Sequence, residues 1–83
     1  MTNVYFPEDI ERYVSGLLIQ ETRTVIASGT TNYDFIDGTI TTALALVTMV
    51  GGDFANVIYL VSKNTNEKEV YELIEKRVQL IGE

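Results

Sequence analysis

Between residues 38 and 62 the chain carries a single charged side chain, Asp53. The remainder holds all six basic residues and all but one of the twelve acidic residues. A helix without a charged face is normally buried on every side, whereas each helix of a small bundle keeps one face toward solvent. The uncharged middle of the chain therefore has to lie in the core, against a second chain, or in a membrane.

A membrane-spanning segment is the first of these possibilities to be excluded. The charge-free run from Gly38 to Gly52 is shorter than the roughly 20 apolar residues that a spanning helix requires. Asp53 and Asn56 would fall near the middle of any longer span, where polar groups are costly. The segment from Met1 to Phe6 also lacks the basic and apolar regions of a signal peptide. We therefore expect a cytoplasmic protein with no membrane partner.

The composition excludes several classes of function. Without His or Cys, the chain has no thiolate nucleophile, no imidazole base, no disulfide and no ordinary zinc site. A net charge of −6 argues against nucleic acid as a partner, because tracking phosphates needs a basic stripe. A site made of carboxylates alone remains, and nothing in the sequence places a closed cleft around them. We expect no enzymatic activity, no metal and no cofactor.

Helix signals are clear in the first third of the chain. Pro7, followed by acidic residues, is typical of a helix start, and apolar residues at helical spacing extend this helix to at least Gln20. Residues 22–28 fit either two more helical turns or a short strand, and residues 29–32 form a break in both cases.

A second helix crosses the uncharged middle. Its expected start is Asn32 or Asp34, with Asp37 as a later alternative, because Asp and Asn are favoured as caps. The pair of glycines at 51–52 is a strong stop signal.

The last two elements differ in how clearly they are encoded. Asp53 is a suitable cap for residues 54–61, whose apolar spacing is helical, although residues 56–62 are also a good buried strand. In the final segment Asn66 and Glu69 have the spacing of a capping box, which predicts a helix beginning there.

These elements predict an all-α fold, a small bundle of about four helices that forms one domain over residues 1–83. The alternative is an α+β domain with short strands near 22–28 and 56–62. Apolar runs as short as these fit both structures.

The uncharged middle also predicts a contact between chains. Large exposed apolar patches are uncommon on monomers, and a domain of this size without disulfide or metal buries a small core. We expect a homo-oligomer, most simply a two-fold dimer. The alternative is that the threonine-rich faces are solvated and the two middle elements cover each other. The residues predicted at the interface are Thr41, Ala45, Thr48, Met49, Phe54, Val57 and Leu60.

A possible anion site surrounds the start of the second helix. A glycine followed by hydroxyl side chains there would offer backbone N–H and hydroxyl donors to an anion, with an arginine as the cation and a tyrosine to stack on a ring. The alternative is capping, with threonine hydroxyls bonded to carbonyls four residues earlier. The residues predicted to bind a small nucleotide-like anion are Arg23, Tyr33, Gly38, Thr39, Thr41 and Thr42.

Two functional hypotheses follow from these patterns. The first is a small acidic, non-enzymatic protein that regulates or inhibits another protein by direct contact and self-associates through residues 38–62. The alternative is an oligomeric protein that binds or sequesters a small anionic ligand.

Overall fold

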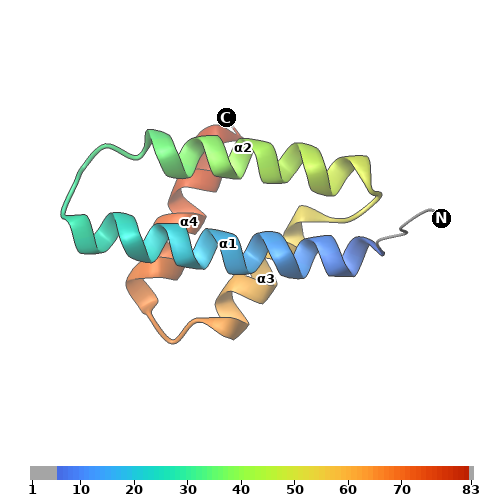
Figure 1. The fold of residues 1–83 in the computed structure, drawn as a ribbon, viewed down its shortest axis with the longest axis horizontal. Helices are drawn as coiled ribbons and strands as arrows, with labels where there is room; N and C mark the ends of the chain where they lie inside the picture. The colour runs from blue at the N-terminus through green and yellow to red at the C-terminus, as the bar shows by residue number, and fades with distance from the viewer. Residues whose placement is uncertain (1–5, 83) are drawn as a thin grey trace.

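The computed structural model describes residues 6–82, and these form four α-helices with no strand among them (Figure 1). The helices are α1 (Pro7–Ser28), α2 (Asp34–Met49), α3 (Phe54–Asn64) and α4 (Lys68–Ile81). The predicted all-α bundle is confirmed. None of the described helices is both long and apolar enough to cross a membrane.

The α+β alternative is wrong. Residues 22–28 are the last two turns of α1, because Thr22 and Val25 continue the core-facing spacing that begins earlier in this helix. Residues 56–62 lie inside α3, where Val57 and Val61 are one helical turn apart and both buried. In both segments packing against the other helices decides between two locally acceptable structures.

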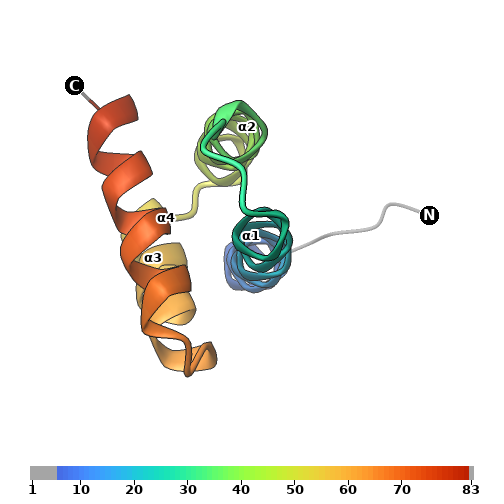
Figure 2. The ribbon, with the colours of Figure 1, turned by 90° about the vertical axis from the view of Figure 1, so that its left-hand side faces the viewer.

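The four helices form two layers. In one layer α1 and α2 lie side by side and run in opposite directions, and in the other α3 and α4 cross one face of this hairpin (Figures 1 and 2). No other helix of residues 6–82 covers the opposite face. We call it the bare face of the α1–α2 hairpin. Its residues are Tyr13, Leu17, Phe35, Gly38, Thr39, Thr42 and Leu46.

The ends of α1 and α2 follow local chemistry. Pro7 occupies the first turn of α1, where its missing N–H would have had no helical partner. Gly29 ends the helix at φ 73°, a left-handed conformation that glycine adopts without a Cβ penalty, and its N–H donates to Ile26 O. At the next helix, which begins at Asp34, the Asn32 side chain accepts a 3.0 Å hydrogen bond from the N–H of Asp34. Asp34 is one of the two early starts that were predicted.

The turn between α2 and α3 matches the predicted stop and cap. Helix α2 ends at Met49, and Gly51 reverses the chain at φ 78°. The Asp53 side chain accepts a 2.9 Å hydrogen bond from Ala55 N–H at the start of α3, so the predicted cap is confirmed.

The predicted capping box of α4 is wrong. Helix α4 begins at Lys68, with Glu67 rather than Asn66 at the cap position. The Thr65 hydroxyl accepts a 3.1 Å hydrogen bond from Glu67 N–H and so forms the turn before the helix. Thr65 is buried while Asn66 is exposed, so Thr65 is the residue of this turn that packs against the rest of the chain.

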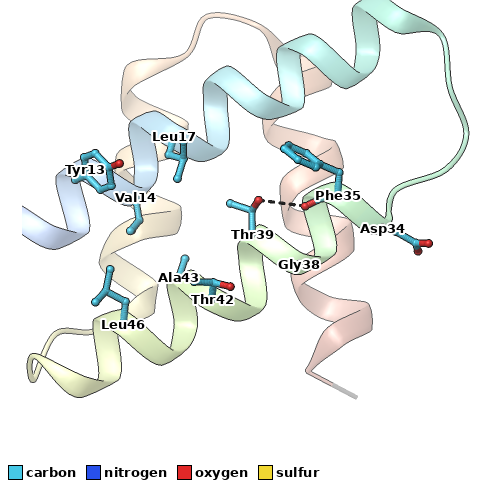
Figure 3. A pocket seen from close by; sticks show the side chains of 10 residues that line it. All are labelled: Tyr13, Val14, Leu17, Asp34, Phe35, Gly38, Thr39, Thr42, Ala43 and Leu46. Atoms are coloured by element: carbon cyan, nitrogen blue, oxygen red, sulfur yellow. Dashed lines mark hydrogen bonds between the residues drawn. The ribbon is translucent and has the colours of Figure 1, made fainter.

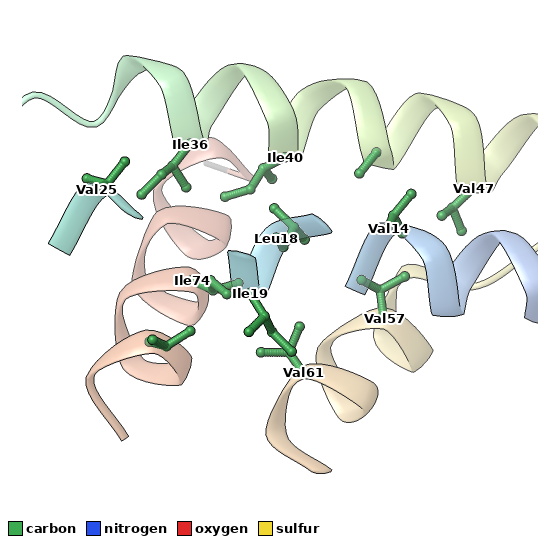
Figure 4. Packing of buried hydrophobic residues seen from close by; sticks show 12 residues of the cluster. Val14, Leu18, Ile19, Val25, Ile36, Ile40, Val47, Val57, Val61 and Ile74 are labelled. Carbon is green, nitrogen blue, oxygen red and sulfur yellow. The ribbon is translucent and has the colours of Figure 1, made fainter. Parts of the chain in front are cut away.

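One buried cluster joins all four helices, and α1 contacts each of the other three (Figure 4). Figure 4 shows Val57 and Val61 of α3 and Ile74 of α4 pointing toward the α1 side of this cluster. The α2 side is supplied by Ile36 and Ile40, both fully buried. Burying each such side chain contributes about 1.5–3 kcal/mol to the free energy of unfolding.

Candidate functional site

A groove of about 530 Å³ runs along the bare face between α1 and α2 (Figure 3). Its floor includes the core residues Val14 and Ala43, so the groove lies directly above the hydrophobic core. Asp34 is the one charged residue among the described residues that line it. The groove is therefore a mainly apolar surface with one charged residue on an acidic protein.

Two aromatic rings mark the ends of this groove. Tyr13 of α1 stands at one end and Phe35 of α2 at the other, with Gly38 and Thr42 between them (Figure 3). Tyr13 is 65% exposed and Phe35 is 63% exposed. Large rings exposed in one patch are uncommon on monomers and are typical of contact surfaces.

The bare face carries a heptad-like seam along α2. We call it the bare seam, and it consists of Phe35, Thr39, Thr42, Leu46 and Met49, spaced by four and three residues in turn. Met49 is 81% exposed and extends the seam beyond the groove. Spacing of this kind keeps one stripe of a helix facing a helical partner along its whole length.

The same helix carries a second seam with the same spacing. The core seam consists of Ile36, Ile40, Ala43 and Val47, and all four residues are buried. Helix α2 thus has two neighbouring stripes that suit helix packing. Its own chain fills one of them.

A side-chain hydrogen bond links α1 to α2 and fixes their relative position. The Thr39 hydroxyl donates to the Glu21 carboxylate and also lies 3.1 Å from the carbonyl oxygen of Phe35. One of the two threonine hydroxyls that line the groove is therefore already used within the chain.

A buried carboxylate holds the turn after α2 against α1. Glu11 is 5% exposed, and its Oε2 accepts a 2.7 Å hydrogen bond from Asp53 N–H. The side-chain amide of Asn56 lies 3.3 Å from the same oxygen. Gly52 passes so close that a Cβ there would lie 2.9 Å from Glu11 Oε2. In the sequence Glu11 is one of the acidic residues that mark the start of α1, although its spacing from Val14 and Leu18 also places it beside the core face.

An ion pair joins α2 to α4 on the side away from the groove. Arg77 Nε and Asp37 Oδ1 are 2.8 Å apart, and Arg77 Nη2 and Asp37 Oδ2 are 2.6 Å apart. The Tyr33 ring lies 5.2 Å from the guanidinium. The hydrogen bond from Arg77 holds the pKa of Asp37 below its ordinary value, because it stabilises the charged carboxylate.

The predicted anion donors at Gly38 are not free. Helix α2 begins at Asp34, so Gly38 lies in its second turn, where N–H groups bond to carbonyls of the preceding turn. The N-terminal end of the helix carries Asp34 and Asp37, whose charges oppose an anion. The Thr41 hydroxyl donates to Asp37 O at 2.9 Å, the alternative stated for these threonines.

The other predicted anion-binding residues lie in different places. Arg23 bonds to Glu67 at 2.6 Å across the α1–α4 boundary, and Tyr33 lies against Arg77. Neither residue lines the groove. Gly38, Thr39 and Thr42 do line it, so half of the predicted set belongs to the bare face.

The residues predicted at an interface also lie in different parts of the structure. Thr41, Ala45, Thr48 and Met49 are exposed on α2, whereas Phe54 and Leu60 are half-buried on α3. Val57 is 0% exposed and lies in the core of its own chain, which leaves it no surface for a partner. Tyr13 and Leu17 of α1 and Phe35 of α2 line the groove and were not among the predicted interface residues. For the two residues of α1 the reason is that α1 comes beside α2 only after folding.

Two further findings bear on function. In residues 6–82 no three acidic side chains gather in a way that could hold a metal ion. No protein-family model matches the chain, and no curated protein and no solved structure is similar enough to indicate a relationship.

Proposed function

We propose that this is a small non-enzymatic protein that regulates or inhibits by contact with another protein chain, and that the bare face of the α1–α2 hairpin is its contact surface. The observation that carries the proposal is the mainly apolar groove with Tyr13 and Phe35 exposed at its ends. The predicted contact through the uncharged middle of the chain is thus proposed again for the surface of α2, and the surface of α1 beside it is added.

The lining of the groove favours a protein over a small molecule. Sites for small ligands combine apolar walls with a few converging polar groups that fix the orientation of the ligand. Here the Thr39 hydroxyl is bonded within the chain, and Asp34 is the one charged group among the described lining residues. A long apolar stripe with helical spacing suits an amphipathic helix instead.

In-cell crosslinking tests the proposal. The photoreactive residue p-benzoylphenylalanine replaces Phe35 in one variant and Tyr59 in a matched control, since Tyr59 is an aromatic residue on α3 that is 61% exposed. We expect irradiation to give a covalent adduct with a protein from position 35 and a much weaker adduct from position 59. Absence of an adduct at position 35, or equal adducts at both positions, would contradict the proposal.

A further inference from the structure

We infer that the chain covering the bare face is a second copy of this protein, related by a two-fold axis, so that two α1–α2 hairpins pack into a four-helix arrangement. This inference rests on the proposed function and names the partner at that surface. Three observations carry it: the charge of the face, the spacing of its side chains and its size.

The distribution of charge favours a second copy. Two chains with a net charge of −6 repel each other, so they can meet closely only through a surface that brings few acids together. The groove brings few acids together, because Asp34 is the one charged group among its described lining residues and the Glu21 carboxylate beside it accepts a hydrogen bond from Thr39. A partner recognised by its opposite charge would instead be met by acidic side chains at the contact.

The spacing of the bare seam favours a helical partner that runs along the hairpin. Its intervals of four and three residues are those of packed helices in coiled coils and four-helix bundles. On α1, Ile10, Tyr13 and Leu17 follow the same intervals beside it. A second hairpin offers two helices with this spacing, and the two-fold contact uses the same patch on both copies.

The hairpin is large enough for a weak dimer. At 1.5 Å per residue and about 10 Å of width, α1 with 22 residues and α2 with 16 residues present at most roughly 600 Å² when they are in contact over their whole lengths. Each partner in a specific interface contributes about 600–1,000 Å². The face therefore corresponds to the lower end of this range, and we expect a dimer that dissociates in the micromolar range.

Sedimentation equilibrium of the purified chain tests the inference. Between about 10 and 500 µM the wild-type mass should rise toward twice 9.3 kDa. Phe35→Glu should weaken dimerisation at least about 100-fold, because it buries an unpaired charge. The matched control Tyr59→Glu should leave dimerisation unchanged. Raising the salt concentration should strengthen the dimer, since salt screens the repulsion between acidic chains.

The outcomes separate this inference from the proposed function. Circular dichroism first shows whether the Phe35→Glu variant is folded. If it is unfolded, Thr42→Glu, at an exposed position in the same groove, takes its place in the dimerisation measurement. A wild-type chain that stays at 9.3 kDa overturns the inference, and a dimer that resists both variants does so as well. If the crosslink from position 35 then leads to a different protein, the proposed function still stands; if no crosslink forms, both fail.

Discussion

The core seam and the bare seam of α2 have the same spacing and opposite environments. Ile36, Ile40, Ala43 and Val47 are buried against the other helices, whereas Phe35 and Met49 of the neighbouring stripe are mostly exposed. The core seam is aliphatic throughout, and the bare seam places threonines between larger apolar residues. Periodicity thus shows that a stripe suits helix packing, and the side chains on it distinguish a stripe that its own chain fills from one that stays open.

The largest expected effect tests whether the two seams differ in energy. Ile40→Ala should lower the free energy of unfolding by about 3 kcal/mol, because it removes buried carbons and leaves a cavity. Thr42→Ala on the bare seam should change it by less than about 0.5 kcal/mol in the monomer. Urea denaturation at low protein concentration measures both. Equal losses would remove the distinction between the seams.

The next effect concerns the turn between α2 and α3, which Glu11 holds against α1. Glu11→Ala should cost about 2 kcal/mol of unfolding free energy, since the Asp53 N–H and the Asn56 side-chain amide lose their acceptor. Glu11→Gln keeps one acceptor oxygen and should lose less. Thermal unfolding of the two variants gives the comparison, and a Glu11→Ala protein as stable as wild type would show that the carboxylate does not hold the turn.

A smaller effect comes from the link between α2 and α4. The lowered pKa of Asp37 means that its ion pair with Arg77 contributes fully above the ordinary carboxyl value of 3.8 and is lost as the pH falls through the lowered pKa. Asp37→Asn should therefore cost about 1 kcal/mol at pH 7 and less near pH 2. Urea midpoints measured across this range give the result. A cost that is the same at both pH values would exclude the ion pair as its cause.

The smallest effect is a gain in stability on the core side of α1. Thr22 is 0% exposed, and its hydroxyl has no hydrogen-bond partner in the described part of the chain. Thr22→Val keeps the shape of the side chain and removes the unsatisfied group, so the free energy of unfolding should rise by about 0.5–1 kcal/mol. Thr24→Val, at an exposed position on the same helix, is the matched control and should show no gain. A loss of stability in Thr22→Val would mean that the hydroxyl is satisfied.

Much of the helical architecture could be predicted because its signals are local. Pro7 and Asp53 act within their own turns, and the structure confirms both. Residues 22–28 and 56–62 were ambiguous because β-branched and aliphatic side chains suit strands and helices alike, and tertiary packing decides. The capping box failed at Asn66 because the nearby Thr65 hydroxyl forms the turn instead.

The candidate site was harder to predict because it belongs to two helices at once. Threonines and Gly38 in α2 were recognised as unusual, but the groove also needs Tyr13 and Leu17 from α1. Their place beside α2 depends on the pairing of the hairpin, which no local pattern contains. Val57 shows the reverse case, since an uncharged helix face proved to be core.

Glu11 and Arg77 also bear on how fast the proposed partner would bind. Glu11 holds the turn after α2, and Arg77 holds Asp37 in the first turn of this helix. Glu21 accepts a hydrogen bond from Thr39, further along the same helix. A helix fastened at three points cannot slide along its neighbour, so the groove keeps its shape before any encounter. Binding then needs no folding step and loses little conformational entropy. Since the groove has one charged lining residue and the chain has a net charge of −6, we expect single-phase association no faster than about 10⁵–10⁶ M⁻¹s⁻¹, set by the rate at which two rigid faces find the right orientation.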